Sequence, residues 1–161
     1  MFDWSGLYFQ DIVKVSNEWR TTGYVCFMAS MTTGRMFSDN LINYWGARKQ
    51  LILSGLLVTF GIVVAVSYPH LIVSSIGFML VGFGASSVIP TIYGTVGRTT
   101  EPSKVSIALA SVSSVGFFGF LIGPPIIGFL SQAIGLRWAF LTISLLGIMT
   151  AIRAHQLKKY L

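Results

Sequence analysis

The residues best suited to chemistry lie in one polar stretch, residues 34–49, between two apolar runs. This stretch combines one carboxylate with three basic side chains and two glycines. The carboxylate of Asp39 can pair with a base, or with the positively polarised N-terminal end of a facing helix. If the two apolar runs cross a membrane, the stretch is a tight turn between them. The candidates are Gly34, Arg35, Asp39, Gly46, Arg48 and Lys49.

The rest of the chain carries no pattern typical of an enzyme. It has no nucleophile–base arrangement, no paired carboxylates and no phosphate-binding glycine loop. Neither His70 nor His155 has a partner at metal-ligand or catalytic spacing, and the single cysteine, Cys26, excludes an internal disulfide or a multi-cysteine metal site. We therefore expect no catalytic residue, no metal and no cofactor.

Composition places the chain in a membrane. Of its 161 residues, 53% are hydrophobic and 10% charged, and the mean hydropathy is +0.74. A soluble domain has about 25% charged residues, so this chain lacks the polar surface for a water-facing globule. The net charge of +6 comes from basic residues scattered at the ends of apolar runs. No basic helix or long basic tail indicates a nucleic-acid partner.

Apolar runs predict an all-α polytopic bundle of about five transmembrane helices within residues 21–161. Residues 1–20 are mixed in charge and contain Trp4, Tyr8 and Trp19, aromatics typical of a membrane boundary. We expect residues 1–20 to be the non-cytoplasmic end of a truncated preceding helix and its loop. The predicted spans cover residues 21–38, 51–67, 71–97, 105–136 and 138–152.

Proline and glycine predict irregularities within these helices. Tyr68-Pro69-His70 separates two spans, and Pro90 predicts a kink in the span 71–97. Gly123, Pro124 and Pro125 predict a kinked or tilted helix in the uncharged run 105–136. Gly116, Gly119 and Gly123 form a smooth strip for a close neighbour.

Two further groups of residues are candidates for a solute pathway. Ser86, Thr91 and Tyr93 lie on small or polar stripes of the span 71–97, where hydroxyls either contact a polar solute or serve helix packing. Asp3 is the acid expected to lie within the membrane in an intact protein, or to be solvated near the chain end. Ionisable groups at membrane depth often serve proton relays or substrate binding.

The distribution of basic residues predicts the orientation. With five crossings, residues 35–50, 98–104 and 153–161 share one side and hold eight of the eleven lysines and arginines. The positive-inside rule places that side, with the C-terminus, in the cytoplasm.

Two motifs resemble the major facilitator superfamily. One is the loop Gly34-Arg35-x3-Asp39-x6-Gly46-x-Arg48-Lys49, with Asn40 where that family usually has a basic residue. The other is Gly119-x3-Gly123-Pro124-Pro125-x2-Gly128 in a later span. The start, Asp3-Trp4-Ser5-Gly6-Leu7-Tyr8, is similar to the end of helix seven in a bacterial branch of the family.

The resemblance implies that the chain covers the end of helix seven through helix twelve of a twelve-helix transporter. The missing N-terminal six-helix half would be its partner, besides the lipid bilayer and a small solute. The implied location is the bacterial inner membrane. In that family helices nine and twelve face lipid, and helices eight, ten and eleven border the cavity. The loop residues would form a conformational latch, or else a solvated turn that only sets topology.

The implied function is transport of a small solute by alternating access, with coupling to protons left open. The alternative is a truncated or split membrane protein that does not transport by itself and acts as a helix-packing partner. A self-contained oligomeric channel is a third reading, disfavoured because no ring-forming charge pattern is present.

Overall fold

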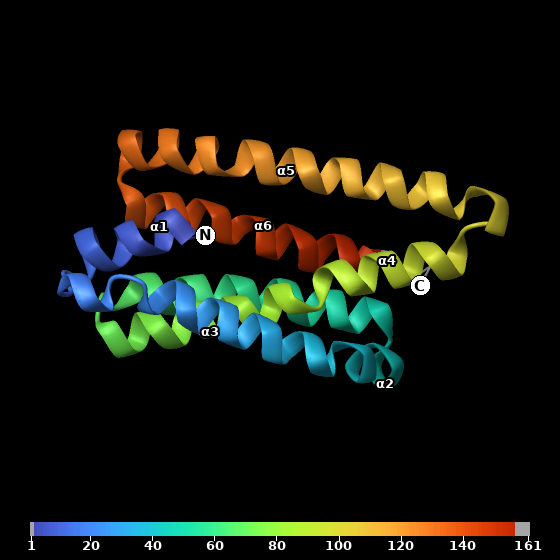
Figure 1. The fold of residues 1–161 in the computed structure, drawn as a ribbon, viewed down its shortest axis with the longest axis horizontal. Helices are drawn as coiled ribbons and strands as arrows, with labels where there is room; N and C mark the ends of the chain where they lie inside the picture. Colours follow the sequence, from blue (N-terminus) through green and yellow to red (C-terminus); the bar gives the residue numbers. More distant parts are fainter. Residues whose placement is uncertain (1, 157–161) are drawn as a thin grey trace.

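The chain folds into long helices that run side by side (Figure 1). This computed structural model describes residues 2–156, and of Phe2, Asp3 and Asp39 it describes the backbone alone. The predicted basic residues Lys158 and Lys159 therefore lie outside the described residues. The described part contains helices and no strand, and four of its helices are long and apolar enough to cross a membrane. The predicted all-α polytopic bundle is confirmed.

The first elements form a short hook at one end of the bundle. Helix α1 (Phe2–Leu7) continues into the π-helix η1 (Tyr8–Ile12), and the 3-10 turn η2 (Asn17–Trp19) follows. These elements reverse the chain and lead it into α2.

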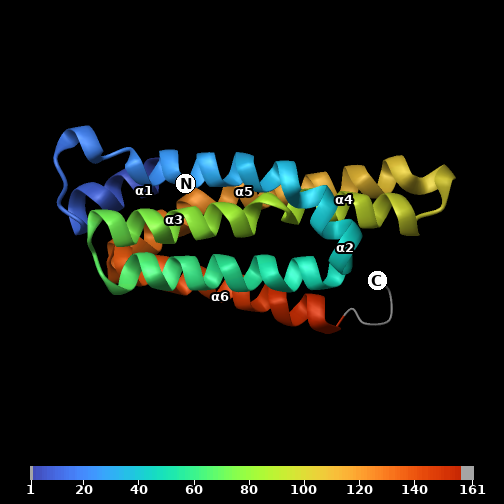
Figure 2. The same ribbon diagram turned by 90° about the horizontal axis from the view of Figure 1, so that it is seen from below.

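Helix α2 (Thr22–Ser67) is a hairpin of two antiparallel limbs (Figure 2). Its one non-helical residue is Gly46, with φ 80° and ψ 155°, a conformation that is essentially restricted to glycine. The predicted turn over residues 34–49 is therefore too long, because helix continues to Gly46 from both sides. Exposed polar residues such as Asn40 and Asn43 can extend a helix beyond its apolar part. The first limb is not one of the four candidate spans, which begin with Asn40–Ser67.

Helices α3 (Leu71–Ser86) and α4 (Val88–Thr99) form one candidate span with a kink at Ser87. This interruption lies three residues before Pro90, where the sequence predicted a kink, and Pro90 accounts for it. Proline lacks the N–H that would bond to the carbonyl of Ser86, four residues earlier, and its ring clashes with that carbonyl.

The last two helices are α5 (Val105–Ile134), entered through the 3-10 turn η3 (Pro102–Lys104), and α6 (Leu136–Gln156). Helix α5 has 30 residues and runs unbroken through Pro124 and Pro125. At 1.5 Å per residue it measures about 45 Å, more than the hydrocarbon core of about 30 Å. It must therefore tilt or protrude. Gly135, with φ 87°, makes the sharp turn into α6.

The second limb of α2 lies between α3 and α6, and glycines allow these helices to approach closely. A Cβ on Gly61 would lie 2.7 Å from the carbonyl oxygen of Gly77, and one on Gly55 would lie 2.5 Å from that of Gly147. The apolar composition of residues 51–67 suits a span that faces lipid, and this expectation is only partly right. Ile62, Ala65 and Val66 are buried, whereas Leu56 and Phe60 are exposed on the outer side. The sequence shows that the limb is apolar but not that two of its sides are covered.

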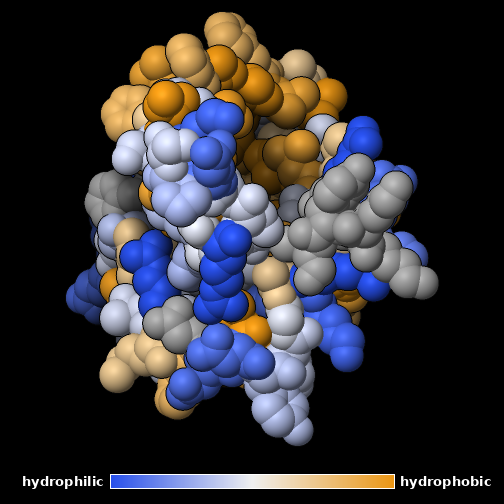
Figure 3. Space-filling model, turned by 90° about the vertical axis from the view of Figure 1, so that its right-hand side faces the viewer, coloured by the Kyte–Doolittle hydropathy of each residue, from blue (hydrophilic) through white to orange (hydrophobic). Residues whose placement is uncertain are grey.

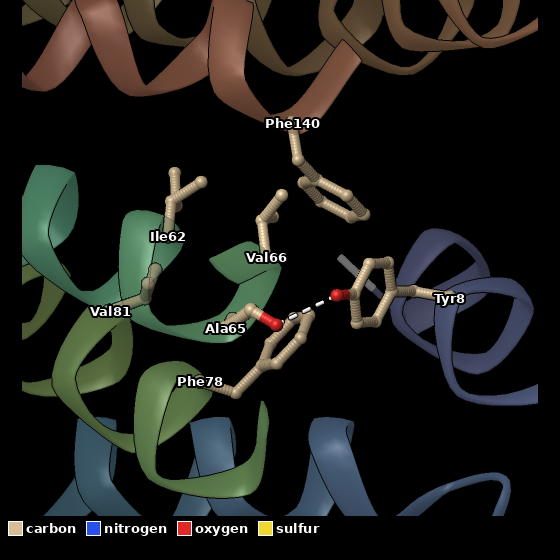
Figure 4. A pocket seen from close by; sticks show the side chains of 7 residues that line it. All are labelled: Tyr8, Ile62, Ala65, Val66, Phe78, Val81 and Phe140. Carbon is tan, nitrogen blue, oxygen red and sulfur yellow. Dashed lines mark hydrogen bonds between the residues drawn. The ribbon is translucent and has the colours of Figure 1, made fainter. Parts of the chain in front are cut away.

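An aromatic cluster fixes the hook to the bundle (Figure 4). Tyr8, Phe9, Phe78 and Phe140 are all buried, with neighbouring ring centroids 5.5–6.2 Å apart. The Tyr8 hydroxyl donates to the carbonyl oxygen of Ala65 at 2.7 Å. The cavity at this cluster has a volume of about 10 Å³, no more than one water molecule occupies. It is part of the core and not a solute site.

The two ends of the bundle differ in the segments they gather. The α2 break, the α4–α5 connection and the end of α6 lie at one end, on the right of Figure 1. Hydrophilic residues surround that end, and hydrophobic atoms cover α5 at the top (Figure 3). The described parts of the predicted basic segments thus lie at one end of the molecule.

Candidate functional site

The residues of the predicted latch take up different roles in the structure. Gly34 is buried, and a Cβ there would overlap Oγ of Ser86 and come 3.1 Å from the ring of Phe83. It therefore lets the first limb of α2 touch α3. Arg35 and Lys49 are exposed, and the side chain of Asp39 lies outside the described residues.

Gly46 and Arg48 have specific structural roles at the α2 break. A Cβ on Gly46 would meet nothing within 4 Å, so its positive φ and not the available space requires glycine. Arg48 is half-buried, and its Nη2 donates to the carbonyl oxygen of His155 at 3.0 Å. His155 lies in the last turn of α6, where a cation favours the negative end of the helix dipole. Arg48 thus ties the second limb of α2 to the end of α6.

A groove at this end brings the α2 break beside α4. Its volume is about 630 Å³. Gly46 and Pro90, predicted for separate roles, both line it, as does Arg98, the one charged residue among the described residues of its lining. Its lining residues are Ile42, Asn43, Gly46, Ala47, Pro90, Thr91, Gly94, Thr95, Arg98 and Thr99.

A buried polar cluster lies next to the kink, and the sequence analysis missed it. The hydroxyl of Ser87 lies 2.9 Å from Nε2 of Gln50 and 2.9 Å from Oγ of Ser54. Gln50 is 4% exposed, and its Oε1 has no hydrogen-bond partner in the described part of the chain. If the amide is flipped, the nitrogen is left unpaired instead. A glutamine within an apolar run was the only signal in the sequence.

The three predicted cavity hydroxyls separate into two groups. Ser86 and Thr91 are 2% and 1% exposed, and their hydroxyls donate to the carbonyls of Phe83 and Ser87 in their own helices. Only Tyr93 is exposed, at 40%, and its hydroxyl lies 2.8 Å from Oγ of Ser113. The packing alternative therefore describes the first two and not Tyr93.

Tyr93 lies in a second groove, between α4 and α5, which we call the α4/α5 groove. Its volume is about 870 Å³. The rings of Phe117 and Phe120, 6.5 Å apart and both exposed, form part of its α5 wall. Its lining residues are Val88, Ile89, Ile92, Tyr93, Ser111, Val112, Ser113, Val115, Gly116, Phe117 and Phe120.

The remaining predicted residues concern packing of α5 and the start of the chain. Gly128 contacts the ring of Trp4, which a Cβ would approach to 3.3 Å. A Cβ on Gly116, Gly119 or Gly123 would meet nothing within 4 Å, so that strip has no neighbour in the described chain. Pro124 and Pro125 lie within unbroken helix. Asp3 lies in α1, and its side chain lies outside the described residues.

Ion pairs and metal-ligand clusters contribute little to this arrangement. The ion pair found among the described residues joins Lys104 and Glu101 at 3.0 Å, with both side chains exposed. No group of three His, Cys, Asp or Glu side chains among them could hold a metal ion. The chemistry that remains is hydrogen bonding by hydroxyls and contact with apolar surfaces.

Known relatives cover almost all of this chain. It is 36% identical over 155 residues to an uncharacterized MFS-type transporter of Yersinia pestis, covering 96% of this chain and 40% of the relative. It is 34% identical to membrane protein MosC of Rhizobium meliloti, covering 92% of this chain and 36% of the relative. It is 26% identical to a multidrug resistance protein B homolog of Mycobacterium tuberculosis, covering 84% of this chain and 25% of the relative.

The chain thus spans about two fifths, or less, of the length of these relatives. The family model described as Major Facilitator Superfamily matches residues 16–157. These residues include the α2 break, both grooves and α6. By this match and by its fold, the chain belongs to the Major Facilitator Superfamily.

Proposed function

We propose that this chain is the C-terminal part of a secondary transporter that moves a small solute across a membrane by alternating access. The observation that carries the proposal is the bare surface of α5. No residue of that helix is buried, and two of its glycines outside the α4/α5 groove, Gly119 and Gly123, meet no neighbour. A membrane helix with a strip of small residues is suited to close contact with another helix. The part of the relatives that this chain does not span would supply that contact.

Transport is tested by reconstituting the chain into liposomes alone and together with the N-terminal part that its relatives possess. Uptake from a panel of labelled solutes is expected from the pair and not from the chain alone. Stable co-purification of the two parts without uptake of any solute would favour the alternative, a helix-packing partner without transport activity. No association between them would contradict both readings.

The latch at the α2 break is part of this proposal. Asp39 lies four residues after Arg35 in the sequence, and its carboxylate would hold one state through a base or a helix N-terminus of the other half. Asp39→Asn should lower the uptake rate at equal membrane abundance. Asp11→Asn is the matched control, since Asp11 is an exposed acid in η1. Equal uptake by the two variants would leave the stretch with a topological role alone.

We also propose that the end with the α2 break faces the cytoplasm of a bacterial cell, with the C-terminus on the same side. Cys26→Ser removes the single cysteine, after which Lys104→Cys and Tyr68→Cys mark the two ends. An impermeant maleimide should label position 68 in right-side-out vesicles and position 104 in inside-out vesicles. The reverse pattern would invert the orientation.

Proton coupling is the remaining proposal, and Asp3 is its candidate carrier. An acid within a membrane helix can exchange a proton with both sides as the helix moves. An imposed inward proton gradient should accelerate uptake by the reconstituted pair, and Asp3→Asn should abolish that acceleration. Uptake that ignores the gradient would remove this role.

A further inference from the structure

The α4/α5 groove differs chemically from the groove at the α2 break. Arg98, Asn43 and several threonines line the latter. The α4/α5 groove is lined by aliphatic residues, two phenylalanines, a glycine and three hydroxyl-bearing residues, and among the described residues no acidic or basic side chain lines it. A charged molecule bound there would lose its hydration without gaining a countercharge.

The hydroxyl pair in the α4/α5 groove has a defined direction. Oγ of Ser113 donates to the carbonyl oxygen of Leu109 at 2.8 Å, which uses the only proton of that hydroxyl. The contact of 2.8 Å between Ser113 and Tyr93 must then be donated by the tyrosine. The tyrosine proton is therefore engaged, and the lone pairs of its oxygen remain as acceptors in the groove.

Gly116 keeps the groove open on the α5 side. It precedes Phe117 directly and lies one helical turn before Phe120, and its missing side chain leaves space that no atom within 4 Å fills. The volume of about 870 Å³ is in the range of sites for drug-sized molecules. Apolar walls with a few directed polar groups are typical of such sites.

We propose that the α4/α5 groove binds the transported solute, and that this solute is uncharged, largely apolar and carries a hydrogen-bond donor. The apolar and aromatic walls hold its body, and the Tyr93 oxygen accepts its donor. Ser113 is a positioning residue, because it fixes the direction of the tyrosine proton. That the bound solute is the transported one rests on the proposed function. The binding itself concerns the chain as described.

Binding is tested with four photoreactive probes on the chain in lipid nanodiscs. Benzophenone-4-methanol is neutral and has one donor, 4-methylbenzophenone lacks the donor, 4-benzoylbenzoate is an anion and 4-(aminomethyl)benzophenone is a cation. The alcohol should label peptides of α4 and α5 saturably, with at least tenfold weaker half-saturation for both ions. Labelling spread evenly over all lipid-facing helices, or equal labelling by an ion, would overturn the proposal.

Variants separate the hydrogen bond from the available space. Tyr93→Phe should weaken half-saturation by the alcohol about fivefold, the value of one ordinary hydrogen bond, and leave 4-methylbenzophenone unchanged. Tyr68→Phe is the matched control, because Tyr68 is an exposed tyrosine at the end of α2, outside the lining of the groove. Gly116→Leu should abolish saturable labelling by both neutral probes, whereas Gly97→Leu, at a similarly open position outside the groove, should not. Equal effects of each variant and its control would refute the assignment.

The last step uses the chain combined with the N-terminal part of its relatives. Saturable labelling by the alcohol should persist, and Gly116→Leu should stop uptake of the transported solute. Loss of labelling on addition of the N-terminal part would show that a helix covers the groove and would overturn the inference. Uptake that Gly116→Leu leaves unchanged would also overturn it while the proposed transport function stands. Labelling without any uptake would contradict the function and leave the binding site intact.

Discussion

Close helix packing at Gly77 gives the sharpest stability prediction. A Cβ there would lie 2.6 Å from the Cβ and the backbone nitrogen of Ala65, and 2.6 Å from the carbonyl oxygen of Gly61. Two of these three atoms are backbone, so relief requires α3 to move away from the second limb of α2. Overpacking of this kind costs about 1–3 kcal/mol. Three simultaneous contacts favour the upper end of that range.

Helix propensity acts in the opposite direction in Gly77→Ala. Alanine is favoured over glycine in a helix interior by about 1 kcal/mol. The net expectation is a loss of about 2 kcal/mol, or about 4–8 °C in the melting temperature of a chain of this size. Gly97→Ala is the matched control, because a Cβ there meets nothing within 4 Å and should gain up to about 1 kcal/mol.

The assay is thermal unfolding of the purified chain in detergent, followed by circular dichroism at the helical band. The two variants should shift in opposite directions, Gly77→Ala downward and Gly97→Ala upward or not at all. A melting temperature of Gly77→Ala at or above that of the unmodified chain would mean that propensity outweighs contact. The reasoning from close approach between α2 and α3 would then be wrong.

The same measurement checks three further variants. Gly46→Ala should lower the free energy of unfolding by about 1–3 kcal/mol, because alanine is strained at the positive φ of this position even though the space around it is open. A melting temperature equal to that of the unmodified chain would show that the break can form without glycine. Ser87→Ala should lower the free energy of unfolding by about 1–3 kcal/mol, because it leaves the buried amide nitrogen of Gln50 unpaired. Adding Gln50→Leu should restore much of this stability, and additive losses in the double variant would refute the coupling of the two residues. Arg48→Gln should lower the free energy of unfolding by about 0.3–1 kcal/mol at low salt, because it removes a cation from the negative end of the α6 dipole. A loss that does not depend on salt would argue against the helix dipole as its cause.

The sequence predicted the arrangement of helices better than their surroundings. Proline and glycine marked the kink beside Pro90 and the turn that ends in Gly46, because backbone chemistry at those positions is local. The apolar runs predicted the long helices for the same reason. The helix boundaries at residues 34–49 were wrong, since polarity shows where a helix leaves the membrane and not where it ends.

Predictions about side-chain surroundings depended on partners that the sequence does not show. Thr91 and Tyr93 are two residues apart on α4 and looked equally suited to a cavity, yet Thr91 is 1% exposed with its hydroxyl bonded to the carbonyl of Ser87, whereas Tyr93 is 40% exposed in the α4/α5 groove. The hydrogen bond between Gln50 and Ser87 joins residues 37 positions apart, and that of Arg48 joins residues 107 positions apart. Neither pairing follows from local spacing.

The glycines of the helices illustrate this limit and also support the proposed partner. Those of α2, α3 and α6 that serve close packing, including Gly34, Gly61, Gly77 and Gly147, would clash with a neighbouring helix if they carried a Cβ. Gly94 and Gly97 of α4 and the strip on α5 would meet nothing. Both groups have the same composition and helical spacing. Glycine in a helix interior costs about 1 kcal/mol relative to alanine, and close contact offsets that cost in the first group. The second group has no equivalent contact among the described residues, and its helices, α4 and α5, are the ones that flank the α4/α5 groove. The open glycines and the α4/α5 groove lie on the same two helices, and this supports the proposal of a second body that faces this side of the bundle.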